Sequence, residues 1–575
     1  MEKLLNAKLL HFILITVLLS FIGCSSVKVS DYVSPNYSDS EIRAIEIQNI
    51  SENLKEKPVE SLWKAYLLKN TENISGTSQS SDEIQLFNTS ANYCLDLYYQ
   101  AREKNDIVNA NRYYSSLSLL APDSVKEITI DFSEDQKKLA SLATSHDARN
   151  EENDIIQTKK VSDFIAGTVT IWIDLGIKVE KGVGYANRVI GSGFFIRKDG
   201  YIVTNYHVIE ETVNPKYEGY SRLYIKLSSD TETRIPARVV GYDKSLDIAL
   251  LKTEVDAPYV FTLGSSLNLE VGDTIYAIGS PIGLTSTITR GIVSSYDRQL
   301  LSTAAVMQID AAVNSGNSGG PLINKDGEVQ GIVFAGITDY EGLNFAIPVE
   351  YLKAIIPRLY NDDFFDTNDT QNNSISLPKE VTSAWIGAYG ITYKEPGQLE
   401  GSGVQVLYTM PGGSCDLAGI KSGDIITAIN GQKVNSIEEL GFEMVKLSSK
   451  MVVPFSLADS NRKDIPVYLD VRPEYPTLQI RERDSDYNLM YSLLGMKLEN
   501  ASASKKNQFI VTSIVKGSIA DESGFSVHDS VTLEKMEAKE DDGYFVIQIY
   551  TKKRKSGYLN VSLSIGAPMD SYQIF

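Results

Sequence analysis

The stretch Asn314-Ser315-Gly316-Asn317-Ser318-Gly319-Gly320-Pro321 places the strongest constraint on how this chain can fold. Glycine has no Cβ, so Gly316, Gly319 and Gly320 permit a tight turn with positive φ angles and close approach of another main chain. Such a turn presents the Ser318 hydroxyl beside aligned main-chain N–H groups, which a nucleophile and the oxyanion it creates require. Alone, the stretch also fits a Gly/Ser surface loop, so other residues must decide.

A serine nucleophile needs a base, and the chain has only four histidines to supply one. His11 lies in an N-terminal apolar stretch, His146 in a polar helical region and His528 close to the C-terminus. His207 precedes the serine and ends an apolar strand pattern, so it is the predicted base. A lone histidine is more often structural than catalytic, and this prediction therefore needs a third group.

A carboxylate supplies the third group. Asp247 heads the apolar run Ile248-Ala249-Leu250-Leu251, where we expect it to be half-buried. A carboxylate in such a place fixes the tautomer of a neighbouring imidazole and stabilises its protonated form. Asp243 is the alternative, although its setting in Gly241-Tyr242-Asp243-Lys244 is more typical of a turn.

Five motifs along the chain carry a family resemblance. They are Gly191-Ser192-Gly193-Phe194, Thr204-Asn205-Tyr206-His207-Val208, Asp247-Ile248-Ala249-Leu250, Gly316-Asn317-Ser318-Gly319-Gly320 and Asn344-Phe345-Ala346-Ile347-Pro348. The order His, Asp, Ser is that of chymotrypsin-like enzymes rather than of subtilisins or α/β-hydrolases. Together the motifs resemble those of HtrA/Deg-type serine proteases.

This resemblance implies an ATP-independent endopeptidase of the cell envelope that acts in protein quality control. It also implies a homo-oligomer, either a trimer or a multiple of a trimer. It implies these site residues: catalytic His207, Asp247 and Ser318, and oxyanion-binding Gly316, Asn317 and Ser318. It also puts Ala312, six residues before the nucleophile, at the base of the primary specificity pocket. Because an uncharged pocket would leave a buried Lys or Arg unpaired, we expect cleavage after small or medium aliphatic residues.

Residues 1–23 read as an export signal, because a basic start is followed by an apolar run that is short for a transmembrane helix. The sequence Phe21-Ile22-Gly23-Cys24 resembles a bacterial lipoprotein processing site in which Cys24 is acylated, although Phe21 replaces the usual leucine. An uncleaved signal anchor is the alternative. We expect the domains outside the cytoplasm, lipid-anchored to a membrane on its periplasmic side or at the cell surface.

The N-terminal third contains two segments of different composition. Residues 24–60 are rich in Ser, Asp and Asn, which predicts a polar tether. Residues 61–150 show helical apolar spacing, with a polar turn at Lys104-Asn105-Asp106 and a stop at Pro122. This hairpin is similar to one tetratricopeptide repeat, but a single copy is a weak signal and a plain helical bundle fits equally well.

Between residues 160 and 360 the apolar pattern changes to the period of two that strands show. Asp199-Gly200 and Asp326-Gly327 each predict a β-hairpin. Many short strands without intervening helices predict a chymotrypsin-like double β-barrel, with the cleft between the barrels. A helix over residues 351–360 closes this predicted domain.

Residues 361–378 are rich in Asn and Asp and are predicted to be a linker. Residues 379–472 resemble a PDZ domain, whose carboxylate-binding loop is Trp385-Ile386-Gly387-Ala388. A helix over 437–447 then flanks a groove in which a C-terminal peptide adds as a strand. Residues 485–566 repeat the plan in eroded form and are predicted to be a degenerate PDZ-like domain.

Composition excludes several other classes. The net charge of −19 argues against nucleic acid as a partner. Of the three cysteines, Cys24 belongs to the lipid site, while Cys94 and Cys415 fall in separate segments, so no disulfide framework is indicated. No Cys or His pairs have metal-ligand spacing and no Gly-rich loop precedes a Lys, so neither metal nor cofactor is predicted.

The sequence thus predicts a multidomain protein with a helical N-terminal region, a double β-barrel and two α+β PDZ-like domains. The predicted partners are unfolded or misfolded proteins as substrates, C-terminal peptides at the PDZ groove, and a membrane through the lipid. A non-catalytic holdase or scaffold that binds chain ends is the alternative from another class. A processing protease with a single substrate would share the same chemistry.

Overall fold

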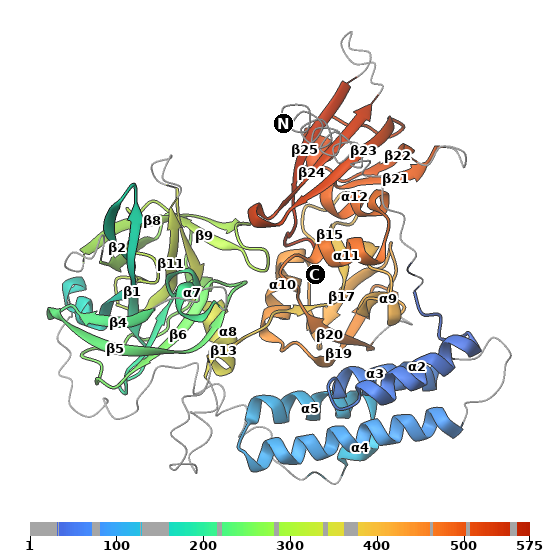
Figure 1. Cartoon of the computed structure of the whole chain (residues 1–575), viewed down its shortest axis with the longest axis horizontal. Coiled ribbons are helices and arrows are strands. Elements are labelled where there is room, and N and C mark those ends of the chain that lie inside the picture. Colours follow the sequence, from blue (N-terminus) through green and yellow to red (C-terminus); the bar gives the residue numbers. More distant parts are fainter. Residues whose placement is uncertain are drawn as a thin grey trace, which may run out of the picture.

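The computed structural model contains a helical region, a pair of β-barrels and two further α+β domains, which follow one another along the chain (Figure 1). It describes residues 32, 34–71, 81–126, 128, 160–214, 221–280, 287–336, 343–360, 378–459, 464–501, 507–551 and 561–575. The predicted signal peptide, Cys24 and residues 361–377 of the predicted linker lie outside the described residues. No helix within these described ranges has the length and apolar character needed to cross a membrane.

The helical region contains α2 (Ser40–Asn53), α3 (Pro58–Asn70), α4 (Ser81–Glu103) and α5 (Ile107–Leu120). The predicted polar turn separates α4 from α5, and the Asp106 side chain caps α5 by accepting the Asn109 N–H at 3.0 Å. The predicted tether is wrong over residues 40–53, which form α2. Ile50 of this helix is buried, and Ile42 and Ile47 pack against the same helical core.

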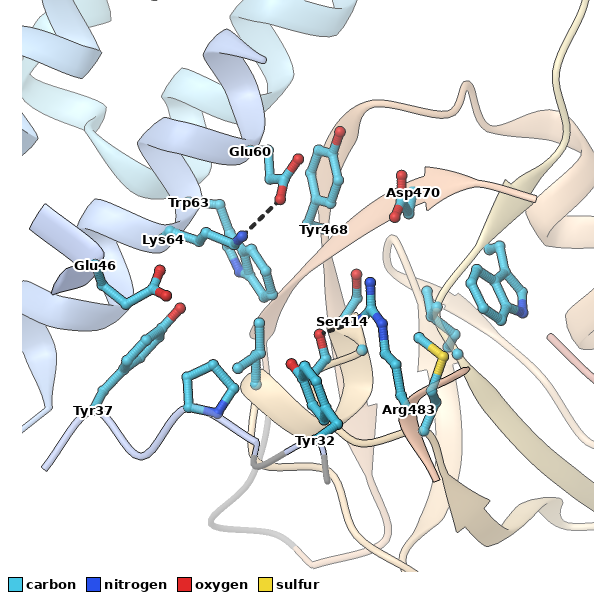
Figure 2. Close-up of a pocket in the computed structure, with 18 residues that line it drawn as sticks. Tyr32, Tyr37, Glu46, Glu60, Trp63, Lys64, Ser414, Tyr468, Asp470 and Arg483 are labelled. Atoms are coloured by element: carbon cyan, nitrogen blue, oxygen red, sulfur yellow. Dashed lines mark hydrogen bonds and ion pairs between the residues drawn. The ribbon is translucent and has the colours of Figure 1, made fainter. Parts of the chain in front are cut away.

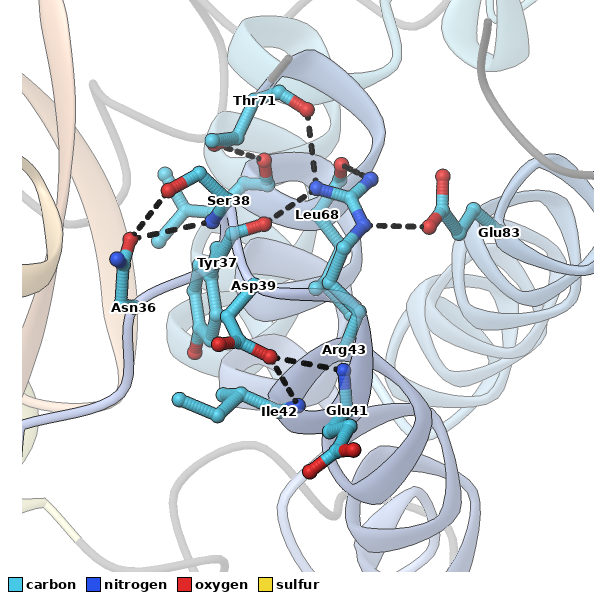
Figure 3. A network of polar contacts seen from close by, with 11 residues as sticks. Asn36, Tyr37, Ser38, Asp39, Glu41, Ile42, Arg43, Leu68, Thr71 and Glu83 are labelled. Atoms are coloured by element: carbon cyan, nitrogen blue, oxygen red, sulfur yellow. Dashed lines mark hydrogen bonds and ion pairs between the residues drawn. The ribbon is translucent and has the colours of Figure 1, made fainter. Parts of the chain in front are cut away.

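A buried ion pair holds the helical region together (Figure 3). Arg43 of α2 is 3% exposed, and its Nε donates to Glu83 Oε1 of α4 at 2.7 Å. The other guanidinium nitrogens donate to main-chain carbonyl groups, including Leu68 at 2.6 Å and Thr71 at 3.0 Å. Because the buried charge is paired and each of its three nitrogens donates a hydrogen bond, Arg43 connects three helices.

Two six-stranded barrels form the central domain, as predicted. In the first, the order β5-β4-β1-β2-β3-β6 is closed by pairing of β5 with β6; the second closes in the order β10-β11-β12-β9-β8-β7. The first contains β1 (Thr168–Glu180), β2 (Val183–Phe195), β3 (Tyr201–Thr204), β4 (Arg222–Leu227), β5 (Asp230–Asp243) and β6 (Ile248–Thr253). The second contains β7 (Thr274–Gly279), β8 (Thr287–Arg298), β9 (Val306–Ile309), β10 (Pro321–Ile323), β11 (Val329–Gly336) and β12 (Asn344–Pro348).

Both predicted hairpins of this domain are present. Gly200, with φ of +92°, turns the chain from β2 into β3, and Gly327, with φ of +84°, turns it from β10 into β11. Two helices complete the domain. Helix α7 (Tyr206–Val213) follows β3, and α8 (Val349–Leu359) follows β12. Helix α8 is the closing helix predicted over residues 351–360, with ends that differ by one or two residues.

The first C-terminal domain is a sheet in the order β14-β20-β19-β17-β16-β15, flanked by helix α10 (Ile437–Lys446). Its strands and second helix are β14 (Ala384–Trp385), β15 (Ala388–Tyr393), β16 (Gly403–Thr409), α9 (Ser414–Leu417), β17 (Ile425–Ile429), β18 (Gln432–Lys433), β19 (Met451–Leu457) and β20 (Ile465–Val471). A short preceding strand, β13 (Lys379–Glu380), pairs in parallel with β5 of the first barrel.

The second C-terminal domain has helices α11 (Pro476–Arg483) and α12 (Asp486–Leu494) packed near a sheet ordered β21-β22-β23-β24-β25. The remaining elements are β21 (Met496–Asn500), β22 (Gln508–Ile514), α13 (Ile519–Glu522), β23 (Ser530–Lys539), β24 (Tyr544–Thr551) and β25 (Val561–Pro568). His528, with φ of +74°, adopts the left-handed conformation that Gly423 adopts in the first domain, with φ of +99°. The eroded repeat therefore keeps this turn without its glycine.

The first C-terminal domain contacts both the helical region and the barrels. Trp63 of α3 stacks on Tyr468 of β20 at 5.8 Å between ring centroids, and its indole N–H donates to the Pro466 carbonyl at 2.8 Å. On another side, Tyr351 of α8 packs edge-on against Phe442 of α10 at 5.4 Å. In Figure 1 this domain accordingly lies beside the barrels and above the helices α3 and α5.

Candidate active site

His207 and Asp247 lie together in the first barrel. His207 is in the first turn of α7, directly after β3, and Asp247 immediately precedes β6, the strand that pairs with β3. The His207 main-chain N–H donates to Asp247 Oδ1 at 2.8 Å, and His207 Nδ1 lies 2.8 Å from Asp247 Oδ2. Both carboxylate oxygens thus bind one residue, which fixes the position of the imidazole ring.

The main chain at Asp247 is held in an uncommon conformation. Its φ is +55°, in the left-handed region that non-glycine residues seldom occupy. The side-chain amide of Asn205 donates to the Asp247 carbonyl at 2.8 Å. The Asp247 side chain is 11% exposed. The alternative, Asp243, is buried and accepts the Leu246 main-chain N–H at 3.1 Å, as expected of a turn residue.

The electrostatic setting of His207 favours its protonated form. Burial alone lowers the pKa of an imidazole, but the hydrogen bond and the charge of Asp247 outweigh it, and the pKa of His207 is raised above its usual value. The ring remains 44% exposed, so a substrate can reach it. By contrast, burial raises the pKa of Asp243 to about 6.

The Ser318 turn lies between β9 and β10, where Gly316 and Gly319 have φ angles of +102° and +86°. A Cβ on Gly319 would stand 2.2 Å from both the Ser192 carbonyl and the Thr204 hydroxyl, so only glycine fits. The turn is thereby pressed against the first barrel. The sequence pattern predicted the turn but not that it packs against the first barrel.

Ser192 of β2 is the residue that binds this turn. Its main-chain N–H donates to the Ser318 carbonyl at 2.8 Å, and its hydroxyl donates to the Gly316 carbonyl at 2.6 Å. The same hydroxyl accepts the Ser280 N–H at 2.9 Å. Sequence reasoning gave Ser192 no role of its own; the available signal was a buried serine between two glycines in a strand.

The Ser318 hydroxyl donates to the Phe334 carbonyl of β11 at 3.1 Å. The main-chain N–H groups of Gly316 and Ser318 make no hydrogen bond within the described residues, whereas that of Asn317 is used in the turn, donating to the Asn314 carbonyl. Two of the three predicted oxyanion-binding residues therefore keep a donor that a ligand can use.

The remaining predicted site residues that the structure describes are Ala312 and the loop 385–388. Ala312 is exposed, and its carbonyl accepts the Thr289 hydroxyl at 2.9 Å. The loop Trp385-Ile386-Gly387-Ala388 joins β14 to β15, with Gly387 at φ of +73°. Trp385 packs in the core of the second PDZ-like domain, and the Ala388 N–H is already bonded, to the Phe575 carbonyl at 2.8 Å.

A cavity of about 150 Å³ lies beside this loop, between the helical region and the two C-terminal domains (Figure 2). Glu60 and Lys64 of α3, paired at 2.7 Å, line one side, and Asp470 and Arg483 line the other. Burial raises the pKa of Asp470. The sequence gave no sign of this cavity, because its walls come from segments hundreds of residues apart.

Comparisons with known families divide the chain in the same way. Residues 191–332 match the trypsin-like peptidase domain, residues 376–456 the PDZ domain, and residues 477–569 the TP0546 family PDZ domain. Residues 41–139 match a family described only as a domain of unknown function. The prediction of a trypsin-like domain followed by two PDZ domains is therefore confirmed.

Similar curated proteins are named probable periplasmic serine endoprotease DegP-like. One from Marinomonas sp. (strain MWYL1) is 31% identical over 356 residues, which cover 60% of this chain and 70% of that protein. Another from Halomonas elongata is 35% identical over 270 residues, covering 45% of this chain and 52% of that protein. A solved structure, the HtrA-type protease AlgW with decapeptide, is 23% identical with a TM-score of 0.41, over 54% of this chain and 98% of its own. The domain matches and the Marinomonas relative together show that this chain belongs to the DegP/HtrA family of serine endoproteases.

Proposed function

We propose that this protein is an ATP-independent serine endopeptidase of the bacterial cell envelope that hydrolyses unfolded or damaged proteins. The observation that carries the proposal is the 2.8 Å contact between His207 Nδ1 and Asp247 Oδ2, in a chain whose Ser318 lies on the adjoining turn. The similar curated proteins are named periplasmic, which supports an envelope location, and the sequence around Cys24 supports a lipid anchor there.

In the proposed mechanism, Asp247 accepts a hydrogen bond from the Nδ1–H of His207 and so fixes the tautomer in which Nε2 carries no proton. Nε2 takes the hydroxyl proton of Ser318 as the serine oxygen attacks the substrate carbonyl. The N–H groups of Gly316 and Ser318 bind the oxyanion that forms. The imidazolium then gives its proton to the leaving amine, and water hydrolyses the acyl-enzyme by the same route.

One movement is required before the attack. The Ser318 hydroxyl, which donates to the Phe334 carbonyl, must give up this bond and direct its proton toward His207. Catalytic hydrogen bonds commonly form only when substrate is bound, so this resting contact is compatible with activity. Binding of a substrate strand beside β11 would cause this movement of the Ser318 hydroxyl.

The other modules have proposed roles in substrate choice. Because the family resemblance puts the uncharged Ala312 at the base of the primary specificity pocket, we expect cleavage after small or medium aliphatic residues. The first PDZ domain is proposed to bind C-terminal peptides along β15, next to the loop 385–388. The family resemblance supports assembly into homo-oligomers.

The test is cleavage of an unfolded casein substrate by the purified protein and by Ser318→Ala. We expect the substitution to lower the rate by several orders of magnitude while the fold is kept, because it removes only the nucleophile. Ser315→Ala, at an exposed serine of the same turn, is the matched control and should cleave normally. Undiminished cleavage by Ser318→Ala would refute the proposal. A wild-type protein that prevents aggregation of casein but never cleaves it would support the holdase alternative.

A further inference from the structure

The chain returns from the second PDZ-like domain to the first after β25. Figure 1 shows the C-terminal end within the first domain, not beside β25. Phe575 exchanges two main-chain hydrogen bonds with Ala388 of β15, each 2.8 Å long, and the Gly390 N–H donates to the Gln573 carbonyl at 3.0 Å. Tyr389 and Ile574 form an antiparallel bridge. Residues 573–575 thus extend the sheet as a strand paired with β15.

This added strand occupies the groove between β15 and α10. The Phe575 side chain is 4% exposed and belongs to the core of the first domain, together with Leu440 and Met444 of α10. On the floor of the groove, a Cβ at Gly390 would stand 3.0 Å from the Phe575 ring. Main-chain pairing with a side chain in an apolar pocket is how an extended peptide is bound by strand addition.

A second set of contacts holds the segment just before the groove. The Arg472 guanidinium, 5% exposed, pairs with the Asp570 carboxylate and donates to the main-chain carbonyls of Ser571, at 3.1 Å, and Ile574. Asp570 also bonds Ser302, in the connection between β8 and β9 of the second barrel. The segment is therefore fixed by residues of the first C-terminal domain, and Asp570 just before it contacts the protease domain.

We infer that residues 571–575 are the resident ligand of the first PDZ groove, and that an external peptide with a large apolar last residue binds there only by displacing them. This inference rests on the proposed peptide-binding role of the groove. A tethered segment has an effective concentration on the order of millimolar, so it competes strongly with any free peptide. Asp570, which bonds Ser302 of the barrel connection, directly precedes this segment, so displacement of the segment would take place next to the protease domain.

The experiment measures binding of a fluorescent decapeptide that ends in Ser-Tyr-Gln-Ile-Phe, by anisotropy. All proteins carry Ser318→Ala, so that the probe is not cleaved and the result does not depend on catalysis. We expect Phe575→Asp, which puts a charge into the apolar pocket, to bind the probe about 10-fold or more tightly than the parent. Leu399→Asp, at a residue of the same domain that is 89% exposed, is the matched control and should bind like the parent.

Equal affinity of the parent and Phe575→Asp would overturn the inference. Failure of both to bind would overturn it too, by excluding the groove as a peptide site, while casein cleavage by the Ser318 enzyme would still stand as a separate test of the protease proposal.

Amide hydrogen exchange decides the matter if Phe575→Asp does not fold. In the protein with residue 575 unchanged, a saturating concentration of the probe should speed exchange in residues 571–575, because the Phe575 N–H loses the Ala388 carbonyl. Residues 388–390 should stay protected, because the probe replaces the segment. Bound probe with unchanged exchange in 571–575 would show that the groove is not its site and would overturn the inference.

Discussion

Replacing Asp247 by Asn tests the link between the buried carboxylate and the base. The amide keeps the size of the side chain, and one oxygen can still accept the His207 main-chain N–H, now at 2.8 Å. The amide nitrogen, facing Nδ1 across the present 2.8 Å contact, favours the tautomer that carries its proton on Nε2. That tautomer cannot take a proton from Ser318. The corresponding change in a Ser-His-Asp protease lowers kcat about 10⁴-fold, or about 5 kcal/mol of transition-state stabilisation.

The pH profile adds a second readout. Activity requires neutral His207, so in the wild type it is lost as the pH falls through a pKa that lies above the usual histidine value. Asp247→Asn removes the charge and the hydrogen bond that raise this pKa and leaves the burial that lowers it. The acid limb of the residual activity should therefore move to lower pH.

The assay is kcat/KM for a fluorogenic peptide with an aliphatic residue at the cleavage site, measured from mildly acidic to mildly alkaline pH. Asp243→Asn is the matched control, because Asp243 is also a buried carboxylate, four positions earlier, and accepts main-chain N–H groups of its own turn, including that of Leu246. It should retain activity at neutral pH. A loss below about 10-fold in Asp247→Asn, or an acid limb that moves upward, would refute the reasoning.

Three further changes probe other parts of the chain. Ser192→Ala leaves the buried Gly316 carbonyl and the Ser280 N–H unpaired, which costs about 1–3 kcal/mol of free energy. We therefore expect kcat to fall about 10-fold or more with KM little changed. An unaltered kcat would contradict the positioning role. Glu83→Ala leaves the carboxylate partner of the buried Arg43 missing, and it should lower the free energy of unfolding by about 3–5 kcal/mol in urea titrations. Removal of the exposed Asp123 carboxylate is the control and should change this free energy little. Cys24→Ala should release the protein from membranes on fractionation; a wild-type N-terminus far downstream of Cys24 would end the lipoprotein hypothesis.

Much of the fold and the chemistry could be read from local sequence. Alternation of apolar residues marks strands because their side chains point to opposite faces, and Asp-Gly pairs mark the hairpins at Gly200 and Gly327 because such turns need positive φ. The candidate nucleophile and base follow from the few residue types able to do that chemistry. Helix α2 was missed, because its apolar residues do not form one continuous face, with Ile50 buried but Ile45 60% exposed, and because the burial of Arg43 depends on Glu83, forty positions away.

The sequence by itself determined which residues carry reactive groups and where turns and strands fall, since these depend on neighbours within a few positions. Only the tertiary structure decided which groups meet. The pairing of β3 with β6 brings Asp247 rather than Asp243 to His207, and the second strand delivers Ser192 to the nucleophile turn. The return of residues 573–575 to β15 joins segments nearly two hundred positions apart, and no local pattern encodes it, because strand pairing is satisfied by main-chain groups that every sequence shares.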